Sequence, residues 1–359
     1  MYYKTKPMSL FYKLSIKEIK RETPNSISVA FNVPSELKSF YKFTAGQYVT
    51  LKLTLDGQEI RRAYSLCSAP SSDEFRIAIK AVKNGRFSKF ANEQLKEGHI
   101  LEVGLPEGRF IFEPQTDRQR NYIGFVAGSG ITPVMSILQT VLLQEPKSSF
   151  TLVYGNKTPN ETIFYHQLTE LQKQFLGRLT IHYVYSQEEV EGQLKGRINK
   201  SVVNTIHQKH IGLKFDNYFL CGPEEMIDSV NSALKEKGIA EKDVKFELFS
   251  TSPTIENTPA NSPHSLDHAR IKVILDGDEA FFEMSTKQTL LEATLKKGMD
   301  APYSCQGGVC SSCIARVTSG NAVMKKNSIL TDKEIADGLI LTCQAHPTSA
   351  EITINFDDV

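Results

Sequence analysis

Four cysteines in the C-terminal part of the chain are the residues best suited, by type and spacing, to carry chemistry. They are Cys305, Cys310, Cys313 and Cys343. The first three share the run P-Y-S-C-Q-G-G-V-C-S-S-C, and the fourth follows in L-T-C-Q-A-H-P. Three thiolates from one loop and a distant fourth have the ligand spacing of a [2Fe–2S] cluster, and two glycines in the loop let it curl around sulfur. The sequence therefore predicts a metal centre that carries single electrons.

Other metal sites and disulfide bonds fit these cysteines less well. A zinc site usually has two short cysteine pairs, whereas here a triplet faces one distant cysteine. A Rieske centre needs two histidine ligands, and Cys343 with His346 supplies only one C-x2-H pair. A disulfide framework needs an oxidising compartment, to which nothing in the sequence points. Zinc remains the main alternative.

Two motifs in the first third of the chain could hold a phosphate and a flat ring. Residues 62–65, R-A-Y-S, end a stretch typical of a β-strand. A guanidinium binds phosphate through paired hydrogen bonds, and a tyrosine ring packs on planar systems. In N-G-R-F-S, Gly85 and Ser88 open an expected helix, whose N–H groups attract phosphate. Each motif alone also fits a plainer structure: a strand with Tyr64 inward and Arg62 outward, and a turn with a serine N-cap.

Two further motifs stand at the ends of apolar strands. Residues 127–133, A-G-S-G-I-T-P, lie between Y-I-G-F-V and the helical run V-M-S-I-L. A glycine-rich turn there lets a pyrophosphate approach the helix N-terminus, although Pro133 replaces the last glycine of G-x-G-x-x-G. Y-F-L-C-G-P places Cys221, Gly222 and Pro223 at the carboxyl edge of a parallel sheet, where ligands bind. A small buried core thiol is the alternative for Cys221.

In this order the motifs resemble those of the ferredoxin–NADP reductase superfamily joined to a C-terminal plant-type ferredoxin domain. Reductase components of multicomponent oxygenases have this arrangement, and the resemblance covers nearly the whole chain. It implies that Arg62 neutralises a flavin phosphate, that Tyr64 packs on the isoalloxazine and that Ser65 lies near flavin N5. Gly85 and Ser88 then belong to the flavin pyrophosphate loop. The barrel length and this loop favour FAD over the FMN of phthalate-dioxygenase-type reductases.

The same resemblance places a nicotinamide coenzyme at the strand-end motifs. The expected contacts in the glycine-rich turn are Gly128, Gly130, Thr132 and Pro133. Cys221, Gly222 and Pro223 would stand beside the nicotinamide, with Cys221 near the reacting atoms but not a nucleophile. Tyr64, Ser65 and Cys221 are thus the expected catalytic residues. Phe249 in F-E-L-F would cover the flavin until nicotinamide displaces it, with core packing as the alternative.

The choice of nicotinamide coenzyme depends on a few residues after the second and third apolar strands. Lys157 stands where NADPH-using relatives often have arginine, and a basic residue there can meet the 2′-phosphate. Gln187 follows the third strand and is not basic, so NADH stays open. A surface lysine is the plain alternative for Lys157. The sequence favours NADPH.

The strands and helices that must position these residues predict three domains. Residues 8–113 are rich in alternating strands and predict an antiparallel β-barrel that binds FAD. Residues 114–250 alternate apolar strands with helical segments, which predicts a doubly wound α/β domain for NAD(P)H. Residues 251–265 contain three prolines and few large apolar residues, as is typical of a linker. Residues 266–359 predict an α+β, β-grasp-like ferredoxin domain.

Composition excludes several classes of protein. The chain has 359 residues, enough for two or three domains, and 42 Lys plus Arg balance 41 Asp plus Glu, so we expect no nucleic-acid partner. The N-terminus has no signal-peptide core, and the apolar stretch 122–143 is interrupted by A-G-S-G-I-T-P, so we expect no membrane insertion. Isolated Cys67 and Cys221 fit a reducing cytoplasm. His207 and His210 are expected to form an exposed pair.

These expectations favour an enzyme that splits electron pairs. A nicotinamide would deliver hydride to the flavin, and the cluster would pass single electrons to a terminal oxygenase or hydroxylase subunit. The acceptor could also be a Rieske-type hydroxylase or a desaturase. Two alternatives from other classes are a stand-alone oxidoreductase for small acceptors such as quinones, and a non-enzymatic electron carrier with a structural N-terminal half.

Overall fold

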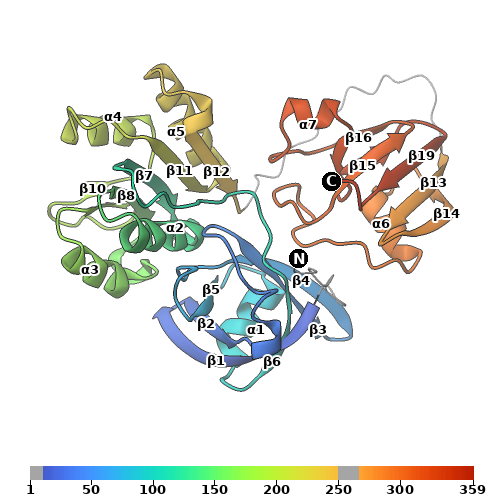
Figure 1. The fold of residues 1–359 in the computed structure, drawn as a ribbon, viewed down its shortest axis with the longest axis horizontal. Helices are drawn as coiled ribbons and strands as arrows, with labels where there is room; N and C mark the ends of the chain where they lie inside the picture. Colours follow the sequence, from blue (N-terminus) through green and yellow to red (C-terminus); the bar gives the residue numbers. More distant parts are fainter. Residues whose placement is uncertain (1–10, 250–266) are drawn as a thin grey trace. The chain divides into compact units, whose positions relative to one another are not determined.

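The computed structural model describes residues 11–249 and 267–359, which belong to two compact units divided between residues 249 and 250 (Figure 1). The predicted linker, 251–265, lies outside the described residues, as do residues 8–10 of the predicted barrel. Each unit is described by itself.

The first unit begins with an antiparallel sheet whose order is β4-β3-β6-β1-β2-β5. Its strands are β1 (Phe11–Thr23), β2 (Ser26–Asn32), β3 (Tyr48–Leu55), β4 (Gln58–Ser65), β5 (Phe75–Lys80) and β6 (Ile100–Gly104). The two edge strands meet where Leu66 bridges Ile77 and the Cys67 N–H donates to the Arg76 carbonyl at 2.8 Å. This contact closes the sheet into the predicted barrel and satisfies backbone groups that an open edge would expose. Helix α1 (Arg86–Gln94) packs against β5.

A parallel sheet of order β10-β9-β8-β7-β11-β12 follows in the same unit. Its strands are β7 (Asn121–Ala127), β8 (Ser149–Asn156), β9 (Leu179–Tyr185), β10 (Leu194–Lys195), β11 (Asn217–Gly222) and β12 (Val244–Leu248). The helices are α2 (Ile131–Gln144), α3 (Tyr165–Gln174), α4 (Lys200–Lys209) and α5 (Glu224–Glu236). Helices α2 and α3 cover one face and α4 and α5 the other, so the predicted doubly wound domain is confirmed (Figure 1). The strand order reverses between β7 and β11, which places a ligand crevice at their carboxyl ends.

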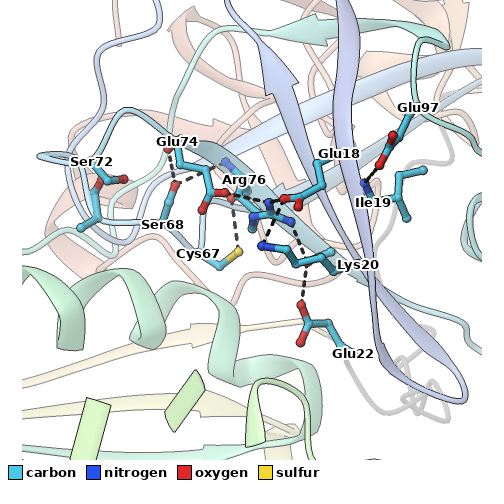
Figure 2. Close-up of polar contacts among 12 residues, drawn as sticks. Glu18, Ile19, Lys20, Glu22, Cys67, Ser68, Ser72, Glu74, Arg76 and Glu97 are labelled. Atoms are coloured by element: carbon cyan, nitrogen blue, oxygen red, sulfur yellow. Dashed lines mark hydrogen bonds and ion pairs between the residues drawn. The ribbon is translucent and has the colours of Figure 1, made fainter. Parts of the chain in front are cut away.

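The barrel and the parallel sheet are joined through the turn that follows β4. Helix α2 holds this turn from one side, because Ser136 Oγ donates to the Ser68 carbonyl at 2.7 Å and Gln139 Nε2 to the Cys67 carbonyl at 2.9 Å. The barrel holds it from the other side through Arg76. Figure 2 shows the Arg76 guanidinium paired with Glu18 and Glu74, while its carbonyl accepts from the Cys67 thiol at 3.3 Å. The strand carrying R-A-Y-S is therefore fixed relative to the helix that follows the glycine-rich turn.

The second unit is an α+β domain with a five-stranded mixed sheet of order β14-β13-β19-β15-β17. These strands are β13 (His268–Leu275), β14 (Asp278–Ser285), β15 (Ile314–Ser319), β17 (Leu339–Leu341) and β19 (Glu351–Asn355). A small sheet of β16 (Ala322–Met324) and β18 (Ala345–Pro347) and helices α6 (Leu290–Lys296) and α7 (Asp332–Ala336) complete it. Thr289 caps α6 in a capping box with Glu292, at the start that the sequence predicts.

The helix that Gly85 and Ser88 were expected to open is present as α1. Its N-cap is Gly85, which contradicts the alternative of a serine N-cap, and Ser88 lies in the first turn, where its hydroxyl accepts from the Val82 N–H at 3.2 Å. One local expectation is wrong. His207 and His210 are not an exposed pair. Both are half-buried, and His210 Nε2 lies 2.9 Å from Nε2 of His182 on β9. Across residues 11–249 and 267–359, no helix combines the length and the apolar character that a membrane span would require.

Candidate flavin, nicotinamide and cluster sites

The end of β4 presents the first group of predicted site residues. Arg62 and Tyr64 are two residues apart and so share one face of the strand, with Arg62 exposed and Tyr64 half-buried. The Tyr64 ring lies 5.7 Å from the ring of Phe87 in α1, which brings this strand beside the helix. Arg62 Nη1 donates to the Arg61 carbonyl at 2.6 Å, and its other donors can reach a phosphate. Ser65 is buried at the end of the strand.

The first turn of α1 has the features of an anion site. A Cβ atom on Gly85 would lie 2.3 Å from Ser88 Oγ and 2.5 Å from a Val82 methyl, so only glycine fits this turn. No described side chain caps the helix, which leaves its first N–H groups free to bind an anion. Tyr64 contacts Phe87, the second residue of α1, so the end of β4 that carries Arg62 and Tyr64 lies beside this helix. A guanidinium and the N–H groups of a helix start are both donors of the kind that bind a diphosphate.

The glycine-rich turn has similar features at α2. Gly128 adopts φ +54°, in the left-handed region that favours glycine, and residues 128–130 form a single 3-10 turn before the helix. Thr132 is buried and its hydroxyl donates to the Ser129 carbonyl at 3.0 Å, so the oxygen can still accept from a ligand. Pro133 lies in the first turn, where its missing N–H costs nothing. No described side chain caps α2 either.

Lys80 at the end of β5 is a residue of this region that the sequence analysis missed. Its Nζ lies 3.8 Å from the position that a Cβ on Gly128 would take. Burial lowers the pKa of Lys80, and the nearby Lys157 lowers it further, while Glu161 opposes the shift. A partly buried ammonium beside a glycine turn can meet a pyrophosphate. No local signal marks this lysine, because Lys80 ends an ordinary alternating strand of the other domain.

The C-G-P turn of β11 lies against the glycine-rich turn. A Cβ on Gly130 would lie 2.1 Å from the Cys221 carbonyl oxygen, so the two backbones are in direct contact. Cys221 is fully buried, and burial raises its thiol pKa well above the ordinary value, with Glu247 adding to the shift. The neutral thiol is a poor nucleophile, in agreement with the sequence-based expectation. Gly222 ends β11, and Pro223 is the N-cap of α5.

Glu247 on β12 completes this group and was missed as a site residue. It pairs with Cys221 in the register of β11 and β12. Burial raises the pKa of Glu247 to about 8, and a hydrogen bond with the Ser65 side chain works against the rise. Its Oε2 is buried without a hydrogen-bond partner among the described residues. Glu247 alternates with apolar residues near the end of this edge strand, but the strand also contains Lys245, so the sequence offered no clear signal for a buried carboxyl group. Phe249, two residues further on, is 37% exposed, which contradicts the core-packing alternative.

The loops after β8 and β9 are joined by their backbones. The Ser186 N–H donates to the Asn156 carbonyl at 3.0 Å and the Gln187 N–H to the Lys157 carbonyl at 2.9 Å. Lys157 is exposed, and its neighbour Asn156 has a buried amide without a hydrogen-bond partner in the described structure. Lys157 and Gln187 therefore lie together at the carboxyl end of the sheet, as the sequence placed them.

The four cysteines of the second unit converge as two pairs. Cys305 Sγ lies 3.1 Å from Cys310 Sγ, and the Cys313 and Cys343 thiols form a second hydrogen-bonded pair. The hydrogen bond with Cys310 lowers the pKa of Cys305 to about 6, helped by backbone N–H groups that include that of Gly307. Thr342 ties the second pair together, because its N–H and hydroxyl donate to the Cys313 carbonyl at 3.0 and 2.9 Å.

This donor set fits a binuclear cluster better than a single ion. Among the described residues, no three His, Cys, Asp or Glu side chains are grouped so that they could hold one metal ion, as a zinc site would need. Two thiolate pairs suit two bridged irons. Ser304 next to Cys305 has a buried hydroxyl without a partner in the described structure, which is available to a sulfide or thiolate. Gly308 adopts φ +73°, so the loop curls as the glycine pair predicted.

Three family models match the chain in the predicted order. Residues 13–112 match the oxidoreductase FAD-binding domain, 125–232 the oxidoreductase NAD-binding domain, and 273–348 the 2Fe-2S iron-sulfur cluster binding domain. Together with the fold and the paired thiols, they define an NAD(P)H-dependent oxidoreductase whose cofactors are FAD and a [2Fe–2S] cluster.

Similar proteins of known function indicate which kind of oxidoreductase this is. The chain is 36% identical to one of the subunits of the 1,2-phenylacetyl-CoA epoxidase of Escherichia coli (strain K12), over 98% of this chain and 99% of that one. It is 33% identical to a 3-ketosteroid-9-alpha-monooxygenase ferredoxin reductase component of Rhodococcus rhodochrous, over 96% of both. A solved phthalate dioxygenase reductase is 25% identical with a TM-score of 0.62, over 96% of this chain and 98% of that one. The chain belongs to the family of oxygenase reductases that contain these flavin, nucleotide and iron–sulfur domains.

Proposed function

We propose that the protein passes electrons from NADPH through FAD and a [2Fe–2S] cluster to a terminal oxygenase component, most like that of a phenylacetyl-CoA epoxidase. The observation that carries this proposal is the arrangement of the four cysteines in two pairs. They follow, in the sequence, regions that match the FAD-binding and NAD-binding domains. The likeness to a component of 1,2-phenylacetyl-CoA epoxidase over nearly the whole chain supports the choice of partner. We also propose the domain bounds 8–113, 114–250 and 266–359 with a linker at 251–265, and a cytoplasmic location.

The flavin, when bound, accepts a hydride from the nicotinamide and gives up electrons one at a time. The chain's own task is to hold and orient it. Arg62, which is exposed, and the first N–H groups of α1, in the turn formed by Gly85 and Ser88, would bind the flavin phosphates, because no described side chain caps this helix. Tyr64 would pack on the flat ring of the flavin, and Ser65 would donate a hydrogen bond to it near the reacting atoms.

The residues at the carboxyl ends of β7 and β11 would hold the nicotinamide coenzyme. Gly128, Gly130, Thr132 and Pro133 form the turn that accepts the pyrophosphate, with Lys80 beside it. Cys221, Gly222 and Pro223 support the ring from the carboxyl edge of β11. Glu247, kept largely protonated at neutral pH by burial, can bond Ser65 without placing a negative charge beside the hydride path. Phe249 is exposed and free to cover the flavin until the nicotinamide arrives.

In the second unit, Cys305 with Cys310 would hold one iron and Cys313 with Cys343 the other. This assignment follows the two pairs seen in the structure. The cluster supplies a one-electron carrier, and the chain supplies thiolates together with the N–H groups and the Ser304 hydroxyl that surround them.

Reconstitution tests the proposed partner. The purified reductase, NADPH and the oxygenase components of a phenylacetyl-CoA epoxidase should together turn over phenylacetyl-CoA. Omitting the reductase should stop the reaction, and a Rieske-type hydroxylase tested in parallel should receive electrons more slowly. If the reductase oxidised NADPH as fast with a quinone and no oxygenase as it does with the oxygenase components, the stand-alone oxidoreductase would be favoured. A pull-down from the native host, analysed by mass spectrometry, identifies the partner independently.

A further inference from the structure

The cysteine loop contains a strained residue that is not glycine. Gln306, directly after the first cysteine, adopts φ +52°. Only one other non-glycine residue in the described part of the second unit has a positive φ, namely Asp276, which shares a tight hairpin turn with Gly277. That hairpin requires the left-handed conformation, and aspartate tolerates it. Gln306 is in no hairpin, and glutamine has no such preference, so another contact must hold it there.

The side chain of Gln344, directly after the fourth cysteine, supplies that contact. Its Nε2 donates to the Gln306 carbonyl at 2.9 Å. The Gln344 backbone is itself fixed on both sides, because its N–H donates to the Leu341 carbonyl at 2.9 Å and its carbonyl accepts from the Lys325 N–H at 3.0 Å. Its side-chain stem lies against Gly308, where an added Cβ would be 3.1 Å from Gln344 Cγ.

Fixing this carbonyl also fixes the N–H of the next residue. The Gln306 C=O and the Gly307 N–H belong to one planar trans peptide and point in opposite directions. With the carbonyl held by Gln344, the Gly307 N–H points at Cys305 Sγ, 3.3 Å away. A hydrogen bond to a cluster thiolate stabilises the more negative, reduced cluster and so raises its reduction potential.

We propose that Gln344 is a positioning residue for the cluster: it holds the Gln306 carbonyl so that the Gly307 N–H is aimed at the Cys305 sulfur, and it thereby favours the reduced cluster. This inference rests on the proposed ligand set. It assigns to a residue outside that set the task of adjusting the electron equilibrium between flavin and cluster.

The test is a redox titration of the full-length holoprotein, with the cluster followed by electron paramagnetic resonance. Gln344→Met keeps the length of the side chain and removes both of its hydrogen bonds, the one to the Gln306 carbonyl and one with the Cys343 thiol. We expect the equilibrium of electron transfer from flavin to cluster to fall about tenfold, equivalent to an about 59 mV lower one-electron potential. Flavin potential and iron content should be unchanged. Gln288→Met, a glutamine of the same unit before α6, serves as the control and should leave the cluster potential unaltered.

A second variant separates positioning from folding. Glycine adopts the left-handed conformation without help, so Gln344→Met should lower the potential less in a Gln306→Gly background. If the single variant does not hold iron, the double variant should regain it. An unchanged potential in loaded Gln344→Met, an equal drop with and without Gln306→Gly, as loss of the Cys343 contact alone would give, or an iron-free double variant would overturn the proposal. Absence of two irons and two sulfides from the wild-type protein would instead contradict the proposed ligand set.

Discussion

Gly130 touches the backbone of Cys221 so closely that no side chain fits between them. An added Cβ would lie 2.1 Å from the Cys221 oxygen, 2.5 Å from its carbonyl carbon and 3.0 Å from the Gly222 nitrogen. All three are backbone atoms, which cannot rotate aside. The glycine-rich turn after β7 and the C-G-P turn after β11 therefore form one surface at the point where the strand order reverses.

Gly130→Ala should separate these two turns. We expect a loss of about 1–3 kcal/mol in the free energy of unfolding, as for other overpacked sites, together with weaker binding of NADP⁺. Urea unfolding and a binding titration measure the two effects. Ser129→Ala, which changes the neighbouring residue without adding a clash, is the control. Wild-type affinity and stability in Gly130→Ala would show that the turns move apart freely.

Arg62→Ala should weaken flavin binding. A charge-assisted hydrogen bond contributes about 1.5–3 kcal/mol, so the Kd for FAD should rise about tenfold to 150-fold. Tyr64→Ala should instead alter the flavin spectrum and the rate of hydride transfer. Arg21→Ala is a suitable control, because Arg21 binds Asn92 near the other end of α1. Full flavin retention by Arg62→Ala after dialysis would refute the phosphate contact.

Features that depend on neighbouring residues in the sequence were predictable, and those that depend on long-range pairing were not. The cysteine loop, R-A-Y-S and the glycine-rich turn each concentrate their residue types in a few positions, and the alternating strand patterns around them indicated the three fold classes. Glu247 and Ser65 meet only because β12 lies beside β11 and the barrel faces that edge. Nothing local marks such a pair.

The one wrong expectation has the same origin. His207 and His210 occur on a polar helix, which suggests exposure, yet α4 packs against α5 and His210 lies against the His182 ring of β9. Tertiary packing, which no local pattern reveals, decided the burial of these histidines.

Glu247→Gln should change how stability depends on pH. The folded-state pKa of about 8 lies above the ordinary 4.5, so the folded protein keeps a proton that the unfolded chain releases. The contribution of Glu247 to stability should thus be fully present below about pH 4.5 and be lost as pH rises toward 8, by at most about 1.4 kcal/mol per pH unit. Glu247→Gln lacks this effect and should be the more stable protein at pH 8.

Urea unfolding of the flavin-free protein at several pH values measures this difference. Ser65→Ala removes the hydrogen bond that lowers the pKa of Glu247, so it should extend the loss of stability to higher pH rather than abolish it. Parallel stability curves for wild type and Glu247→Gln would mean that the carboxyl group is solvated and titrates normally.

Lys157→Ala tests the coenzyme preference. An exposed contact between an ammonium and a phosphate is worth about 1 kcal/mol, so KM for NADPH should rise about fivefold. KM for NADH, which lacks the 2′-phosphate, should stay the same. Lys147→Ala, an exposed lysine after α2, is the control. Equal effects on both coenzymes would place Lys157 at the pyrophosphate, and no effect on either would make it an ordinary surface lysine.

Cys313→Ser should separate the two halves of the reaction. Cys313 is buried and is paired with Cys343, so losing its thiolate should empty the cluster site. Electron delivery to cytochrome c, a one-electron acceptor, should then be abolished. Hydride transfer from NADPH to the flavin, seen as bleaching in stopped flow, should remain nearly intact, because the described residues 11–249 and 267–359 belong to separate compact units with their own cores. Cys67→Ser, which changes a buried cysteine of the barrel, is the control and should keep full iron content.

Unchanged electron delivery by Cys313→Ser would mean that electrons do not leave the protein through the cluster. Lost flavin reduction would mean that the second unit supports the first, and the proposed boundary at 251–265 would then be wrong.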